Sequence, residues 1–315
     1  MKIMENNPEY LAEKEEFYKY FERVIVPSVQ TLENRRKKYL AWFMGICLLI
    51  VAWIVLLVRG IVPFVYKGEF GFLICILVLG VCAPMLLYYK QSKENILPVI
   101  IGYFGQFTYL FRPELSEQTL QAGRIMKKYD KLTTDDGFEG IYDEIPVKIT
   151  EYTLLDYKRR KKNNVEMMVA EKKGHGIIFS AKMNKDFQGQ TIVVKDKGIF
   201  NKLARYKGLM RVGLESPEFE KAYEVYSDNQ IEARYILTTV MLEYMLELKK
   251  VFPKTEFSFF DNQLQINIEM KENFFECSSF FRSVINKKRT EKIFKQFYLL
   301  FSIVKTLHLN EKRLL

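Results

Sequence analysis

Two long runs without a charged residue constrain this chain more than any other feature. Residues 40–58 read LAWFMGICLLIVAWIVLLV, and residues 70–89 read FGFLICILVLGVCAPMLLYY. Because a helix rises about 1.5 Å per residue, about 20 apolar residues cross a hydrocarbon core of about 30 Å. A cleaved signal peptide fits poorly, since the first run begins well inside the chain and a second run follows it. The sequence therefore predicts two transmembrane helices.

The segment between the two runs, residues 59–69, has room for a tight turn only, so the two helices are expected to form a hairpin. Basic residues flank the outer ends of this hairpin at Arg35, Arg36, Lys37, Lys38, Lys90 and Lys93. The connecting segment holds only Arg59 and Lys67. Because cytoplasmic flanks carry the excess of lysine and arginine, we expect both termini in the cytoplasm.

The chain divides on this basis into three parts: an N-terminal cytosolic amphipathic helix (1–38), the transmembrane hairpin (39–89) and a cytosolic domain (90–315). The last part has an ordinary domain size, and we expect it to fold alone from about Lys93 onward. In the first part, Phe17, Phe21 and Val24 recur at helical spacing. This stripe either docks a partner or packs on the chain's own cytosolic domain, which is the commoner use of such a stripe.

Segments rich in β-branched and aromatic residues dominate the cytosolic part. Strands are predicted over residues 138–142, 145–157, 165–170, 176–182, 191–194, 210–214, 223–226, 256–260 and 264–268. Turns are predicted at 133–137, 158–164, 172–175 and 261–263, a short helix at 94–107, a short helix or turn at 123–129, and long helices over 227–252 and 290–309. Strands and helices do not alternate regularly. The predicted class is a membrane-anchored α+β fold, in which the two-helix transmembrane hairpin precedes a mainly antiparallel-sheet soluble domain with long C-terminal helices.

The charge of the chain is strongly basic, with a formal net charge of +10. A dense cluster stands in the predicted hairpin loop at Lys158, Arg159, Arg160, Lys161 and Lys162. On a tethered cytosolic domain, such a cluster attracts anionic lipid headgroups. The alternative is a solvated loop. The sequence thus indicates a lipid-contact patch on this loop.

The motifs of the common enzyme classes are absent from the sequence. It contains no phosphate-binding loop ending in Gly-Lys-Ser/Thr, no His-Glu-x-x-His and no Gly-x-Ser-x-Gly. His175 and His308 stand in unrelated segments. Asp135 and Asp136 stand in a predicted turn, where carboxylates are ordinarily solvated. We therefore expect no catalytic residue, no metal site and no cofactor.

Two further sequence patterns concern nucleic acid as a partner and the redox state of the compartment. Residues 173–179 (KGHGIIF) are similar to an RNA-binding signature, but His175 and Ile177 stand where that signature needs aromatic rings for base stacking. Nucleic acid is therefore not an expected partner. The four cysteines show neither a disulfide pattern nor a metal-ligand spacing, which fits a reducing cytoplasm.

Arg234 is the candidate site residue on the long helix predicted over 227–252. Ser227 to Gln230 (SDNQ) fits a capping box that begins this helix. On a helical wheel, Arg234 lies beside the apolar stripe formed by Leu237, Met241, Tyr244 and Leu248. A buried guanidinium needs partners, so we expect an ion pair with Glu215, Glu218 or Glu224. The alternative is an anion site formed by Arg234, Ser227 and Asp228 at the helix N-terminus.

Three blocks of the sequence resemble a known family. They are residues 214–221 (LESPEFEK), 225–238 (VYSDNQIEARYILT) and 184–194 (NKDFQGQTIVV). These blocks resemble an uncharacterised bacterial family, the domain of unknown function numbered thirty-one thirty-seven, and the layout over most of the chain is similar as well. The resemblance implies this architecture in a bacterial cytoplasmic (inner) membrane. It implies no activity, substrate or catalytic residue.

Three functions are compatible with these features. The first is a membrane-tethered interaction or scaffold module that binds a protein partner or the anionic bilayer surface, in a role such as envelope maintenance. The second is an enzyme with an unrecognised site for a lipid or nucleotide. The third is a component of an oligomeric transporter or channel, with the chain as a homo-oligomer. The absence of ionisable residues inside the two runs argues against the third function, and the absence of catalytic motifs favours the first.

Overall fold

The computed structural model describes residues 8–59, 67–162, 165–183, 187–196, 206, 208–277 and 279–306. The chain forms two compact units. Unit 1 comprises residues 1–11, 104–275 and 294–315, and unit 2 comprises residues 12–103 and 276–293. The three-part division at residues 38/39 and 89/90 stays a prediction.

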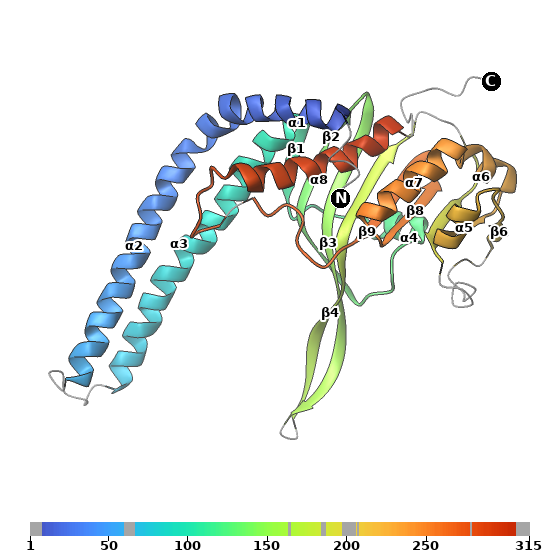
Figure 1. The fold of residues 1–315 in the computed structure, drawn as a ribbon. Helices are drawn as coiled ribbons and strands as arrows, with labels where there is room; N and C mark the ends of the chain where they lie inside the picture. The colour runs from blue at the N-terminus through green and yellow to red at the C-terminus, as the bar shows by residue number, and fades with distance from the viewer. Residues whose placement is uncertain are drawn as a thin grey trace. The chain divides into compact units, whose positions relative to one another are not determined.

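The first helices of the chain follow one another without a break, and the chain bends between them. The helix α1 (Pro8–Tyr20) continues through a π-helical turn, η2 (Phe21–Ile25), into α2 (Val26–Val58). Pro27 lacks the backbone N–H of a normal helical bond, and a π turn absorbs such an irregularity. Figure 1 shows the chain changing direction at this turn. The bend therefore lies next to Pro27.

Most side chains in the apolar part of α2 are not buried in the protein. Leu48 and Val58, for example, are 67% and 82% exposed. Within the described residues, the helical stretch Pro8–Leu56 is long and apolar enough to cross a membrane, and only 6% of its most apolar window is buried. Large apolar side chains around a whole helix are stable in lipid and costly in water.

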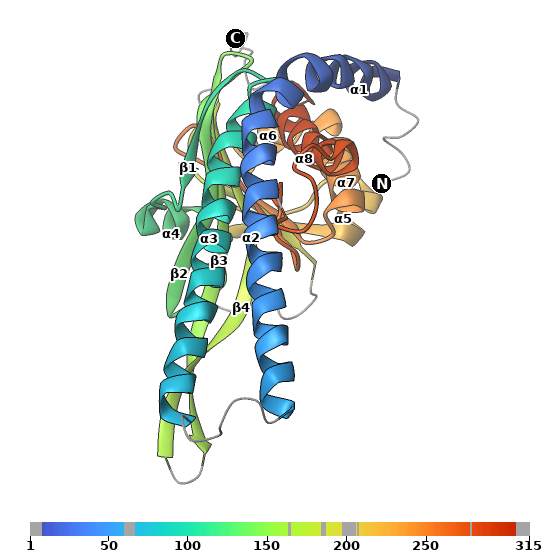
Figure 2. The same cartoon turned by 90° about the vertical axis from the view of Figure 1, so that its left-hand side faces the viewer.

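The second predicted span belongs to α3 (Lys67–Ile101), which lies beside α2 in both views (Figures 1 and 2). The predicted short helix over 94–107 is wrong as a separate element, because α3 runs without a break to Ile101 and a strand begins at Gln106. Most side chains of α3 before Met85 lie outside the described part of the structure. Two membrane spans therefore stay a prediction.

A buried ion pair fastens residues 276–293 to α2 within unit 2. Arg36 donates from Nε and Nη2 to the two carboxylate oxygens of Glu33, at 3.0 and 2.7 Å. Its Nη1 donates to the Phe280 carbonyl at 3.0 Å, while Glu33 accepts the Val284 amide at 2.9 Å. The ring of Phe280 also contacts the rings of Phe43 and Tyr88. Both α2 and α3 therefore contact residues 276–293 and hold them in place.

Unit 1 is built on one sheet. Within the described residues it has nine strands in the order β1-β2-β3-β4-β9-β8-β5-β7-β6, and every pair is antiparallel. The strands are β1 (Gln106–Phe111), β2 (Lys131–Tyr142), β3 (Ile145–Lys162), β4 (Val165–Lys182), β5 (Thr191–Lys195), β6 (Met210–Val212), β7 (Tyr223–Ser227), β8 (Thr255–Phe260) and β9 (Gln263–Glu269). The predicted α+β class with an antiparallel sheet is confirmed.

Helices cover both faces of this sheet. They are α4 (Glu117–Gly123), α5 (Pro217–Ala222), α6 (Gln230–Ile236), α7 (Thr239–Val251) and α8 (Lys287–Thr306). Tyr152 and Leu154 of β3 share one face of the sheet, because successive strand residues point to opposite faces. Leu120 of α4 packs on these two side chains. On the other face, the ring of Phe297 in α8 packs edge-on against that of Phe138 in β2, with ring centroids 4.9 Å apart. Figure 2 shows α4 and α7 on opposite sides of the sheet.

Two predicted turns are wrong, because the chain keeps its strand pairing through them. Residues 133–137 lie inside β2, and residues 172–175 lie inside β4. The register shifts between Thr134 and Gly137 in one case and opposite Leu154 and Leu155 in the other. A β-bulge accommodates an extra residue without ending the strand, and turn-forming residues are tolerated there.

The long helix predicted over 227–252 is wrong in its start and its continuity. Asn229 caps α6, accepting the amides of Ile231 and Glu232, whereas Ser227 is the buried last residue of β7. Leu237 leaves helical geometry, and the Thr238 hydroxyl caps the separate helix α7. The turn between β8 and β9 is confirmed, with positive φ at Asp261 and Asn262 as a type I′ hairpin turn requires.

Candidate functional site

The strands β3 and β4 extend beyond the sheet as a free ribbon. The pairing of β2 with β3 reaches no further than Leu155, and that of β9 with β4 begins at Gly176. Residues 156–162 and 165–172 therefore pair only with each other among the described residues (Figure 1). The predicted loop over 158–164 is wrong in part, because all five basic residues lie on β3 and only residues 163–164 lie outside the described chain.

Each face of the ribbon combines basic and apolar side chains. Residues that oppose each other across a strand pair share one face, so Arg159 lies beside Met168 and Arg160 beside Met167. Both methionines and Tyr157 are exposed. Exposed apolar side chains gain no free energy of burial in water. At a membrane interface, such side chains are buried beside the headgroups that attract the cations.

The basic side chains in the middle of the ribbon fall into two kinds: Lys158 and Arg160 are paired, whereas Arg159 and Lys161 are available. The Glu171 carboxylate lies 2.7 Å from Lys158 Nζ and also binds Arg160. Hydrogen bonds from Lys158 and Arg160 lower the pKa of Glu171, so this carboxylate stays charged. In the described part of the chain, no carboxylate lies within ion-pair distance of Arg159 or Lys161. These two cations are free to meet an external anion.

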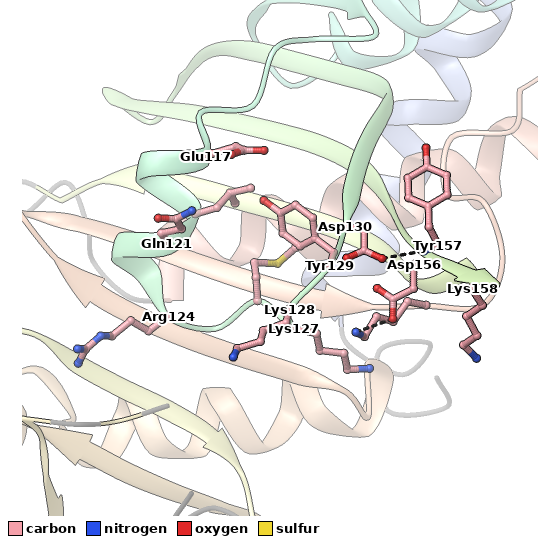
Figure 3. Close-up of a pocket in the computed structure, with 13 residues that line it drawn as sticks. Glu117, Gln121, Arg124, Lys127, Lys128, Tyr129, Asp130, Asp156, Tyr157 and Lys158 are labelled. Carbon is pink, nitrogen blue, oxygen red and sulfur yellow. Dashed lines mark hydrogen bonds and ion pairs between the residues drawn. The ribbon is translucent and has the colours of Figure 1, made fainter. Parts of the chain in front are cut away.

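A pocket of about 740 Å³ opens at the base of the ribbon, on the face that carries α4 (Figure 3). Its basic lining residues are Arg124, Lys127, Lys128, Lys158 and Lys173, and its acidic ones are Glu117, Asp130 and Asp156. Lys173 pairs with Asp156 at 2.7 Å, and Lys127 pairs with Glu269. The excess of cations makes the pocket an extension of the basic ribbon.

The structure gives Arg234, Ser227 and Asp228 different partners. Arg234 is exposed and donates to Gln230 at 3.3 Å and to the Gly213 carbonyl at 3.5 Å. The Ser227 hydroxyl is buried against Thr191, and Asp228 accepts the Gln190 amide at 2.7 Å. Arg234 is therefore not the buried residue that the helical wheel predicts, because the helix ends before Leu237 and the wheel does not extend across that break.

Residues that sequence reasoning set aside come together elsewhere in unit 1. Asp135, Asp136 and Glu151 each offer a carboxylate oxygen, and these oxygens lie within 4.8 Å of one another. The expectation that Asp136 is solvated is wrong, since its side chain is fully buried. Two adjacent acids are the only sequence signal, and it is weak because neighbouring strand residues normally point to opposite faces.

The chain was compared with curated proteins, solved structures and models of protein families. No curated protein matches it. One solved structure, described as the crystal structure of the mycobacterial trehalose monomycolate transport factor A, TtfA, is 12% identical and has a TM-score of 0.36. The alignment covers 68% of this chain and 94% of that chain, and a TM-score this low does not establish a shared fold. Residues 173–309 match the model of a family described as a protein of unknown function (DUF3137), which confirms the family resemblance over this part of the chain.

Proposed function

We propose that this chain is a membrane-tethered module whose cytosolic domain docks on anionic lipid headgroups through the ribbon of β3 and β4. The observation that carries the proposal is the ribbon itself, where the available cations Arg159 and Lys161 stand beside exposed Met168 and Tyr157. Each basic residue close to an anionic surface contributes about 1 kcal/mol. Tyrosine and methionine add apolar contact at the interface.

The tether makes this weak contact effective. The exposed apolar surface of α2 supports a membrane anchor. Once α2 is in the bilayer, ribbon binding becomes an intramolecular event, and the effective concentration of the lipid surface is high. A few kilocalories per mole of ribbon–lipid attraction are then sufficient to keep the domain docked. In this arrangement both termini and the domain lie on the cytoplasmic side of a bacterial inner membrane.

The test places a reporter on the ribbon of the full-length protein. We would label Met168→Cys, in a protein without its other cysteines, with an environment-sensitive dye and reconstitute it in nanodiscs. The emission should shift to the blue in anionic but not in zwitterionic lipid. Salt at about 0.5 M should reverse the shift, because screening then acts within a few ångströms.

A charge variant and a matched control complete the experiment. Arg159→Gln with Lys161→Gln should abolish the shift. Arg211→Gln with Lys221→Gln removes the same charge from exposed positions on β6 and α5, and should leave the shift intact. The proposal would be contradicted if the dye emission stayed typical of water in both lipids. It would also be contradicted if the two double variants changed the emission shift equally.

A further inference from the structure

A bulge in β2 brings three carboxylates to one place on the sheet. Thr134 pairs with Tyr152 and Gly137 pairs with Thr150, so Asp135 and Asp136 together oppose the single residue Glu151. In a regular strand these two aspartates would point to opposite faces. A bulge redirects one of the two side chains. That is why oxygens of both aspartates lie within 4.8 Å of a Glu151 oxygen.

Two of the three carboxylates are removed from water, and Asp135 is half-buried. Asp136 is fully buried and Glu151 is 1% exposed. The Tyr109 hydroxyl donates to Asp136 Oδ1 at 2.6 Å, and the Phe274 amide donates to Glu151 Oε1 at 2.9 Å. Glu151 Oε2 is buried without a hydrogen-bond partner among the described residues. A buried carboxylate oxygen in such a place requires a proton or a cation.

His175 of β4 points independently to the same requirement. It opposes Thr153, two residues beyond Glu151 on β3, so it shares the face of Glu151. Its Nδ1 lies 2.8 Å from the Tyr152 carbonyl, which can only accept, so Nδ1 carries the hydrogen. The buried Nε2 lies 3.2 Å from Glu151 Oε1 and has no hydrogen bond in the described structure, so a proton on Nε2 or a cation between the two atoms must balance the carboxylate. A metal ion bound by both atoms is the cation that accounts for Glu151 Oε2 and His175 Nε2 together, and a proton is the alternative that the experiment below tests.

We propose that Asp135, Asp136 and Glu151 form a binding site for a divalent first-row metal cation of the Mn²⁺, Fe²⁺ or Zn²⁺ class, with His175, which lies beside Glu151, as a further ligand on that side. These ions accept mixed carboxylate and imidazole ligands. Two ligands of one such ion lie about 3.0–3.4 Å apart, which matches the separation of His175 Nε2 and Glu151 Oε1. The bond from Nδ1 to a backbone carbonyl is the usual support of a metal-binding histidine.

The metal site is independent of the lipid-docking ribbon. Glu151 lies on the opposite face of the sheet from Tyr152, which packs on α4 near the basic pocket. The site links β2, β3 and β4 to the segment at Phe274. Bound metal would therefore stabilise this part of unit 1 and hold the segment at Phe274 in place.

The first experiment uses the full-length protein, purified in detergent and treated with a chelator. Titration with Mn²⁺ is followed by the electron paramagnetic resonance signal of the free ion. The wild type should remove about one equivalent, and nitrogen hyperfine coupling from an imidazole should appear on the bound ion. A wild-type protein that binds no stoichiometric Mn²⁺, Fe²⁺ or Zn²⁺ would overturn the proposal and leave a proton or a protein cation as the balancing charge.

Variants then assign the ligands. Glu151→Gln and Asp136→Asn should weaken Mn²⁺ binding by about tenfold or more, while His175→Gln should also remove the nitrogen coupling. Asp130→Asn and Asp156→Asn change carboxylates of the basic pocket and serve as matched controls with unchanged binding. Wild-type affinity in Glu151→Gln would overturn the assignment. If a ligand variant does not fold, the wild-type titration and its nitrogen coupling still decide the matter.

Discussion

At the scale of single residues, Glu33 and Arg36 form a buried ion pair with two hydrogen bonds in unit 2. Burial by itself would raise the pKa of Glu33, but the bonds from Arg36 and the Val284 amide outweigh it and lower that pKa. Glu33→Gln leaves a buried guanidinium without its carboxylate partner, so we expect a loss of about 3–5 kcal/mol at pH 7, measured as a lower melting temperature.

The pH dependence of this loss follows from the lowered pKa of Glu33. A carboxyl group with a lowered folded-state pKa contributes stability above its usual value of 4.5, and this stability disappears as the pH falls through the folded-state value. The melting temperatures of wild type and Glu33→Gln should therefore converge in acid. Glu94→Gln is the control, since Glu94 is an exposed partner of Lys90 at 3.9 Å and should cost less than about 0.5 kcal/mol. A pH-independent gap would contradict this account.

Arg234 illustrates the opposite case of a charged residue at the surface. Its bonds to Gln230 and Gly213 are long, and its side chain is exposed. Substitution of such a residue changes stability by no more than about 0.5 kcal/mol. Arg234→Ala should therefore melt within a degree or two of the wild type. A large drop would revive the interpretation as a structural ion pair.

At the scale of elements, the hairpin of β8 and β9 depends on backbone conformations that few residues adopt. Asn262 has a φ of 56°, and its side chain accepts the Phe187 amide at 3.2 Å. Asn262→Ala and Asn262→Gly both lose that bond, but only alanine is strained at positive φ, by about 1 kcal/mol. We therefore expect the melting temperature of Asn262→Ala to lie below that of Asn262→Gly. Equal melting temperatures would show that the turn relaxes.

At the scale of the whole molecule, the grouping of residues 276–293 with α2 and α3 changes one expectation. The sequence predicts that residues from about Lys93 onward fold alone. However, Phe280 contacts Phe43, and Val284 binds Glu33, both of which such a fragment lacks. We expect the isolated fragment to be cleaved by proteases within residues 276–293 under conditions where the full chain resists. Equal protection in both proteins would restore the original expectation.

The orientation of the whole chain is a separate prediction. With both termini in the cytoplasm, the segment between the two predicted spans faces outward. A Gly68→Cys variant should react with a membrane-impermeant maleimide in intact cells, in a protein without its other cysteines. A matched variant at Lys288, on the cytosolic side, should react only after permeabilisation. Labelling with the reverse pattern would invert the topology.

Local chemistry by itself determined several features of this protein. The uncharged run over residues 40–58 predicts a membrane helix, because length and polarity are properties of the segment itself. The turn at residues 261–263 and the antiparallel sheet follow from residue types and their alternation in the same way. The family resemblance is also carried by contiguous blocks such as residues 225–238.

The tertiary structure decided the features that depend on which strands meet. Residues 133–137 and 172–175 look like turns in isolation, and only pairing with β3 makes them bulges. The same pairing places Asp136 and His175 on the face of Glu151, although neither position carries a metal-ligand spacing in the sequence. The break at Leu237, where Thr238 caps α7, also ends α6 at Ile236, and Arg234 is exposed. A local pattern contains the propensity of each residue, whereas register and burial come from neighbours far away in the chain.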